Sequence, residues 1–144
     1  MPRRSFRLEP LLRARVRDET FAAVINARAQ YVAAEAQRRH TEAMQRLEAA
    51  GAGIDALHGL SLRALQAYLD VLRRVATDLR DERERAQCAA TAARDRLLEA
   101  ARARAVLERL RDRQFEAAAR SRRAAEECER DDLSLRRAAA GDGM

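Results

Sequence analysis

The chain has 144 residues, of which 36% are charged and 3% aromatic, and alanine raises its apolar fraction to 47%. Alanine favours helix but buries little surface, so this composition is poor material for a globular core. A balance of Ala, Glu, Leu and Arg is typical of long helices or a coiled coil. By length we expect a single domain over residues 1–144.

The formal net charge of +6 is concentrated at the amino terminus. Residues 1–17 contain one acidic residue, Glu9, and six arginines: Arg3, Arg4, Arg7, Arg13, Arg15 and Arg17. The rest of the chain is therefore nearly neutral. A basic end on a nearly neutral chain indicates a local contact surface rather than a long groove for nucleic acid.

The first helix is expected at about residues 8–50. Pro10 suits its first turn, because a proline there loses no intrahelical hydrogen bond. Its apolar face consists of Leu8, Leu11, Leu12, Val16, Phe21, Val24, Ile25, Tyr31 and Val32. Further along, the face thins to Ala36, His40, Met44 and Leu47.

A turn is expected at about residues 51–61, where three of the five glycines lie close together. Glycine at a helix end can adopt the left-handed conformation that closes the helix. Ser61 is a suitable N-cap for the next helix. The second helix then runs from about residue 62 to 137, and a short disordered tail ends the chain.

The second helix contains a heptad seam. Alternating steps of three and four residues give positions that are all apolar except Arg83: Leu62, Leu65, Leu69, Leu72, Ala76, Leu79, Arg83, Ala86, Ala90, Ala93, Leu97 and Ala100. Such spacing keeps one side of a helix facing a partner helix. The predicted fold is all-α: an antiparallel two-helix coiled-coil hairpin with a longer second helix.

Folding the chain about the middle of the turn sets residue 11 opposite about residue 100. The seam also changes phase past Ala100, where the first helix runs out. We therefore expect residues 106–137 to project as a helix without a partner from their own chain.

Residues that could carry chemistry are sparse. Cys88 and Cys128 would lie about 60 Å apart on one helix, too far for a disulfide, and suit a reducing cytosol. His40 and His58 lack companions at metal-ligand spacing, and no apolar run is long enough to cross a membrane. We expect a cytoplasmic, non-enzymatic protein without cofactor, metal or small-molecule substrate.

Three stretches, in chain order, match a family pattern. They are Phe6 to Leu12 (FRLEPLL), Ser61 to Leu79 (SLRALQAYLDVLRRVATDL), and Leu107 to Arg113 (LERLRDR) followed by Glu126-Glu127 and Asp131-Asp132-Leu133. In these the chain resembles FliJ, the soluble stalk protein family of bacterial flagellar type III export. The YscO-type stalk proteins of injectisomes are the nearest relatives of that family. The resemblance implies a fold similar to the central stalk of rotary ATPases.

The resemblance also implies partners. The protein would bind a hexameric export ATPase and couple it to the export gate at the cytoplasmic side of the cell membrane. Export chaperones would be further partners. The implied ATPase contacts are Arg3, Arg4, Arg7, Arg13, Leu107, Leu110, Arg111, Asp131 and Asp132. The implied gate contacts are Tyr68, Leu72, Val75 and Leu79. Of these, Leu72 and Leu79 also belong to the seam, whereas Tyr68 and Val75 lie beside it.

Three alternatives stay open at this point. An injectisome stalk protein would have much the same sequence. A nucleic-acid-binding coiled coil would need a basic stripe, but the arginines of residues 38–137 alternate with nearly as many acidic residues. A self-assembling rod would form dimers, whereas the hairpin is expected to be a monomer outside its complex.

Overall fold

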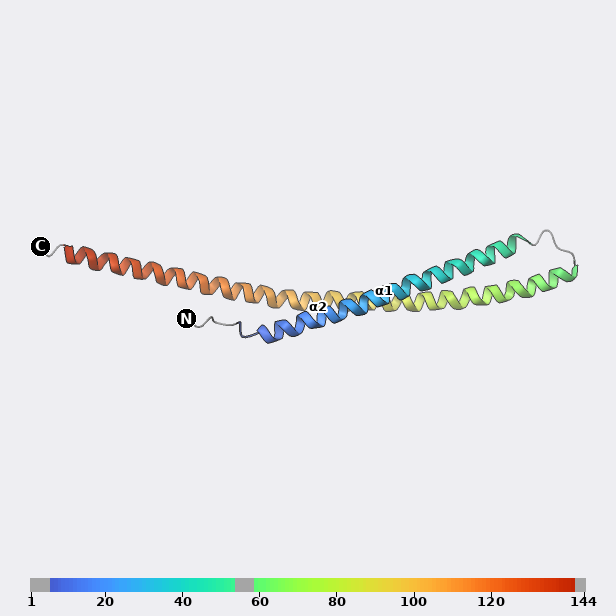
Figure 1. The fold of residues 1–144 in the computed structure, drawn as a ribbon, viewed down its shortest axis with the longest axis horizontal. Coiled ribbons are helices and arrows are strands. Elements are labelled where there is room, and N and C mark those ends of the chain that lie inside the picture. The colour runs from blue at the N-terminus through green and yellow to red at the C-terminus, as the bar shows by residue number, and fades with distance from the viewer. Residues whose placement is uncertain (1–5, 54–58, 142–144) are drawn as a thin grey trace. The chain divides into compact units, whose positions relative to one another are not determined.

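The computed structural model describes residues 6–53 and 59–141 (Figure 1). Two helices contain nearly all of these residues: α1, Glu9–Ala52, and α2, Gly59–Gly141. Within the described ranges there is no strand. The predicted fold class, an all-α two-helix hairpin whose second helix is longer, is confirmed.

Local interactions fix the start of α1. The backbone N–H of Glu9 donates to the carbonyl oxygen of Phe6 at 3.0 Å, and that of Leu12 donates to Leu8 at 2.9 Å. Pro10 occupies the second helical position, where its missing N–H costs no helical hydrogen bond. Glu9 in the first turn also faces the positive end of the helix dipole. The sequence thus starts the helix where it was expected.

The helix ends at the turn differ from expectation. Gly51 lies inside α1, and the N–H of Gly53 lies 3.4 Å from the carbonyl oxygen of Ala50 in a short turn. No glycine among the described residues has a positive φ, so the expected left-handed closure is absent from this part of the chain. Because α2 begins at Gly59, Ser61 lies inside its first turn and is not its N-cap.

The chain forms two compact units, residues 17–101 and residues 1–16 with 102–144. In the first unit, α1 and α2 run side by side in opposite directions (Figure 1). The side-chain amide of Gln30 donates to the backbone oxygen of Ala90 at 3.3 Å, and Arg39 contacts Glu82 at 2.7 Å. Residue numbers thus rise along α1 while they fall along α2, as an antiparallel pair requires.

The register of this pair differs from the expected one. Gln30 contacts Ala90 and Arg39 contacts Glu82. In each pair the two residue numbers add up to 120 or 121, so residues of α1 and α2 whose numbers have this sum lie opposite each other. Residue 100 is therefore level with residue 20 or 21, and the predicted match with residue 11 is wrong. The reason lies at the turn: Ala52, the end of α1, is level with residue 68 or 69, so α2 begins about nine residues beyond it.

The predicted seam of α2 is confirmed. Leu69, Ala76, Ala90 and Ala93 are buried, and every other position from Leu65 to Ala100 in the predicted series is half-buried. Leu62, the first position of the series, is exposed, with 37% of its surface accessible. Four-three spacing therefore identified which side of this helix faces α1.

The apolar face predicted for α1 is wrong as a packing face up to Val32, where of its large side chains only Leu12 is buried and the others are exposed. Further along the prediction is right for Ala36, which is buried, and for His40 and Leu47, which are half-buried, but not for the exposed Met44. The residues of α1 that pack in residues 17–101 are mostly small and follow the same four-three spacing: Ala22, Asn26, Ala29, Ala33, Ala36, His40, Ala43, Leu47 and Ala50. Small side chains let two helix backbones approach closely, which explains why α1 packs through its alanines and not through its larger apolar side chains.

In the second unit, residues 6–16 accompany the distal part of α2. Phe6 and Leu12 are each only 4% exposed, and in α2 residues 103–105, 107, 108 and 111 are half-buried. Every residue from Arg120 to Ala140 is exposed. The expectation that residues 106–137 extend without a partner from their own chain therefore holds for the distal part of that range, and it is wrong near residues 107–111, which residues 6–16 accompany.

Candidate partner-binding surfaces

The implied gate surface lies early in α2, in the unit of residues 17–101. Tyr68 is 54% exposed and Val75 is 42% exposed, whereas Leu72 and Leu79 are half-buried in the seam. The two pairs therefore have different roles in the free protein: one packs α2 against α1, and the other is available to a partner.

Sequence reasoning missed one member of this surface. Val71 is 54% exposed, as much as Tyr68, and lies three residues after it and four before Val75. Spacing of three and four residues places all three side chains on one side of the helix. The buried Leu69 and Ala76 each follow a member of this set by one residue, so the seam lies about 100° further around the helix. The exposed set Tyr68, Val71 and Val75 is named the gate stripe below.

The implied ATPase surface lies in the other unit. Arg3 and Arg4 lie outside the described residues. Arg7 is exposed, and the guanidinium of Arg13 lies 3.7 Å from the carboxylate of Glu9, with 73% of its side chain accessible. An exposed ion pair of this kind holds its partners weakly, so the charge of Arg13 stays available.

The α2 part of this surface consists of Leu107, Leu110 and Arg111. Leu107 is half-buried, Leu110 is 46% exposed, and Arg111 lies 3.5 Å from Asp112. About two turns before Arg111, Arg104 binds Glu108 at 2.7 Å. Apolar and charged groups thus alternate within two turns of helix.

Asp131 and Asp132 are not brought to the same place. Both are exposed, and the backbone oxygen of Asp131 accepts a hydrogen bond from Ser134 at 2.8 Å. They follow Arg111 on the same helix by twenty residues, which corresponds to about 30 Å. The implied ATPase contacts therefore divide into a mixed cluster near residues 104–113 and a separate acidic segment.

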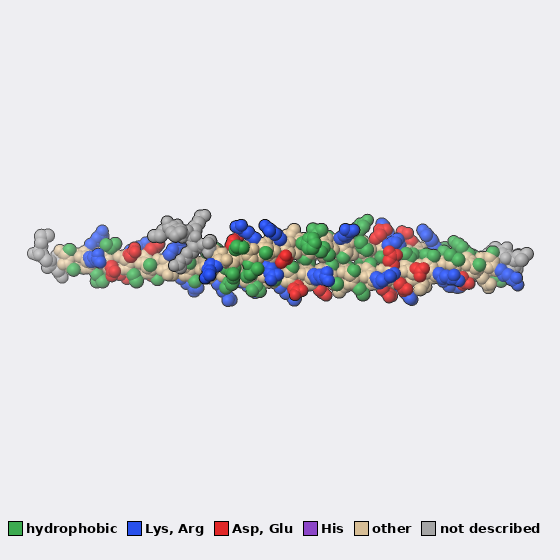
Figure 2. All heavy atoms as spheres, turned by 90° about the horizontal axis from the view of Figure 1, so that it is seen from below, with side chains coloured by type: hydrophobic (Ala, Val, Ile, Leu, Met, Phe, Trp, Pro, Cys, Tyr) green, Lys and Arg blue, Asp and Glu red, His purple; other side chains and the backbone are tan. Residues whose placement is uncertain are grey.

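Within residues 6–53 and 59–141 no group of three or more His, Cys, Asp or Glu side chains could hold a metal ion. Figure 2 shows basic and acidic side chains mixed along the face it presents. Cys88 and Cys128 are both exposed free thiols.

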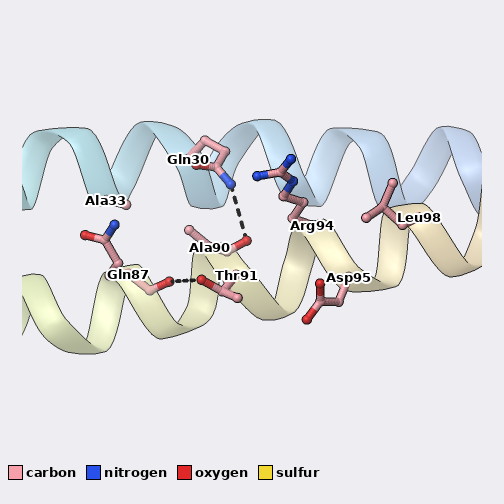
Figure 3. A pocket seen from close by; sticks show the side chains of 8 residues that line it. All are labelled: Gln30, Ala33, Gln87, Ala90, Thr91, Arg94, Asp95 and Leu98. Carbon is pink, nitrogen blue, oxygen red and sulfur yellow. Dashed lines mark hydrogen bonds between the residues drawn. The ribbon is translucent and has the colours of Figure 1, made fainter.

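A shallow groove runs between the helices of residues 17–101 (Figure 3). Gln30 and Ala33 of α1 form one side, and Gln87, Ala90 and Arg94 of α2 form much of the other. Part of its polar lining is satisfied internally, since Gln30 donates to Ala90 and Thr91 donates to the backbone of Gln87 at 3.0 Å. The groove therefore belongs to the packing of the hairpin.

The geometry defines a helical hairpin protein, with a closely packed seam, exposed apolar and charged sides and a fully exposed segment at residues 120–140. None of its described helices is long and apolar enough to span a membrane.

The family model described as Flagellar FliJ protein matches residues 4–142. The chain therefore belongs to the FliJ family, the stalk proteins of flagellar type III export. Searches of curated proteins and of solved structures returned no match.

Proposed function

We propose that this protein is a non-enzymatic stalk and adaptor that binds the hexameric export ATPase and couples it to the export gate. It would act in the cytoplasm, against the inner side of the cell membrane, with export chaperones as additional partners. The observation that carries this proposal is the family match over residues 4–142, which spans both units of the structure. The match to a flagellar family also favours flagellar over injectisome export.

The ATPase would bind the unit that contains the amino terminus and the distal part of α2. Two features support this assignment. The first is the excess of arginine in residues 1–17, and the second is the complete exposure of residues 120–140. Attraction between clustered arginines and an acidic partner speeds association and is weakened by salt. The exposed helix supplies a surface that its own chain leaves uncovered.

The gate would bind the gate stripe, Tyr68, Val71 and Val75. Three exposed apolar side chains on one side of a helix suit a partner that supplies an apolar pocket. Leu72 and Leu79 would support this contact from the seam by holding α2 in place. Substituting the two leucines should therefore weaken the hairpin as well as gate binding.

ATPase stimulation tests the proposal. Replacing Arg3, Arg4 and Arg7 by glutamate, or deleting residues 118–144, should abolish stimulation of the partner ATPase and leave the circular dichroism of the hairpin almost unchanged. The matched control replaces Arg46, Arg63 and Arg74, which are exposed in the other unit, by glutamate. The control should stimulate normally; full stimulation by the first two variants would contradict the assignment.

A further inference from the structure

One strongly apolar surface of α1 is used neither by the seam nor by the proposed ATPase and gate contacts. We name it the outer stripe; its members are Phe21, Val24, Ile25, Tyr31 and Val32. Phe21 and Tyr31 are 69% and 70% exposed, and Val24 is 64% exposed. These are among the largest apolar side chains of the helix, yet they face away from the hairpin seam.

The outer stripe is a continuous surface. Val24 and Ile25 follow Phe21 by three and four residues, and Tyr31 and Val32 follow it by ten and eleven, so all five lie on one side of an α-helix. Single exposed apolar residues are ordinary, but a contiguous set of this size marks an interaction surface. Hydrophobic side chains at this spacing are the typical contacts between one amphipathic helix and another.

The charge on the outer stripe is basic and uncompensated. Arg28 lies one turn after Val24 on the same side, and Arg17 lies one turn before the stripe begins. Neither arginine forms a hydrogen bond or an ion pair within the described chain, whereas Asp18 already has a partner and Glu35 contacts Arg38. Two free guanidinium groups thus accompany the apolar side chains.

From this combination we propose that the outer stripe binds an amphipathic helix of a partner protein that has acidic residues along the edges of its apolar face. The stripe spans twelve residues, about 17 Å, which accommodates about three turns of such a helix. Carboxylates beside the partner's apolar side chains would pair with Arg17 and Arg28, and Arg–carboxylate pairs are the strong, directional kind.

A second copy of the chain fits this surface less well. Two outer stripes brought face to face would place the unpaired Arg28 of each copy, near the middle of the stripe, close together, and like charges at an interface oppose association. The inference does not depend on the proposed export function, because the outer stripe contains none of the residues assigned to the ATPase or the gate.

Binding of two labelled peptides to the full-length chain tests the proposal. Both are helical, with leucine at positions i, i+3, i+4 and i+7; one has glutamate and the other arginine beside the leucines. In fluorescence anisotropy at about 0.15 M salt, we expect the glutamate peptide to bind at least about tenfold more tightly than the arginine peptide. Arg28→Glu should reverse or abolish that preference. Equal binding of the two peptides would overturn the proposal.

A matched pair of double variants locates the binding site. Phe21→Ser with Val24→Ser should weaken binding of the glutamate peptide at least about tenfold, because it removes two of the apolar contacts. Phe115→Ser with Val106→Ser changes the same residue types at exposed positions of α2 and should leave the affinity unchanged. All four positions are exposed, so unchanged circular dichroism is expected for both variants. Equal losses in the two variants would overturn the assignment.

Two further measurements distinguish a partner helix from two other possible occupants of the outer stripe, a second copy of the chain and a lipid surface. Sedimentation should give the same molecular mass for the unchanged chain and for Phe21→Ser with Val24→Ser; a dimer lost in that variant would replace the partner helix by a second copy. Vesicles containing phosphatidylglycerol should not bind through the outer stripe. Vesicle binding that the same variant abolishes, without a preference for the glutamate peptide, would assign the stripe to a lipid surface instead.

Discussion

The hairpin of residues 17–101 and the helical segment of residues 112–140 are built from the same kinds of residue, mainly alanine, arginine and acidic side chains. Only the hairpin buries them. Ala36 is 1% exposed and Leu69 is 4% exposed, whereas the described segment 112–140 contains no buried residue and is fully exposed from Arg120 onward. Helices of similar composition are therefore packed in one region and exposed in the other.

What distinguishes the two regions is spacing. The hairpin places mostly apolar residues, chiefly alanine on α1 and leucine or alanine on α2, at alternating intervals of three and four, so each helix presents a continuous packing side. In residues 112–140 the apolar residues Phe115, Leu133 and Leu135 do not continue such a series. An isolated helix gains little from propensity alone, so this segment is expected to become more ordered when a partner covers it.

Introducing a charge should give the largest difference in free energy of unfolding between the two regions. Ala36→Glu places a carboxylate at the most buried position of the seam, and we expect it to lower the free energy of unfolding by about 3 kcal/mol or more, because a charged and much larger side chain must then occupy the space of a methyl group. Ala124→Glu makes the same change on the exposed helix and should alter stability by about 0.5 kcal/mol or less. Urea unfolding followed by circular dichroism measures both.

Equally small effects of the two substitutions on the free energy of unfolding would mean that the seam is not closed in solution. A loss at Ala124 as large as that at Ala36 would indicate instead that residues 112–140 are packed against something.

Truncating a leucine gives the next largest contrast. Leu69→Ala removes a nearly buried side chain from the seam and should cost about 2–3 kcal/mol. Leu133→Ala removes a side chain that is 56% exposed and should cost about 0.5 kcal/mol or less. The midpoint of urea unfolding compares them, with an unchanged denaturant slope as the check that both variants unfold in the same way. Similar midpoints for the two variants would contradict the burial seen at Leu69.

The packing side of a helix could be predicted from sequence where the pattern of that helix alone determined it. The prediction failed where the packing side depended on both helices. The seam of α2 contains leucines at regular intervals, and its exposed side followed directly. On α1 the large residues Phe21 and Tyr31 were the stronger signal, but the alanines on another side allow closer packing. A single hydrophobicity pattern cannot decide between a bulky face and a small one, because the choice depends on the partner helix.

The predicted register was wrong, whereas the predicted positions of two residues beside the seam were right. The middle of a glycine-rich turn was taken as the fold axis, yet α2 begins about nine residues beyond the end of α1, and no local pattern encodes that offset. Tyr68 and Val75 were correctly placed beside the seam because their positions follow from its phase. Val71 follows from the same phase, so the sequence contained the signal that would have found it.

The smallest expected effect concerns the ion pair that joins the two helices. Arg39 and Glu82 approach to 2.7 Å with 42% and 44% of their side chains accessible, so solvent screens the pair and a double-mutant cycle should give a coupling of about 0.5–1 kcal/mol. The pair Arg73–Asp70 lies within one helix at 2.9 Å with about 60% exposure, and its coupling should be about 0.3 kcal/mol. Raising the salt concentration to about 1 M should reduce both. Because only the first pair links α1 to α2, its alanine variants should also speed hydrogen exchange in neighbouring turns of both helices. Faster exchange confined to one helix would show that this contact does not hold the hairpin together.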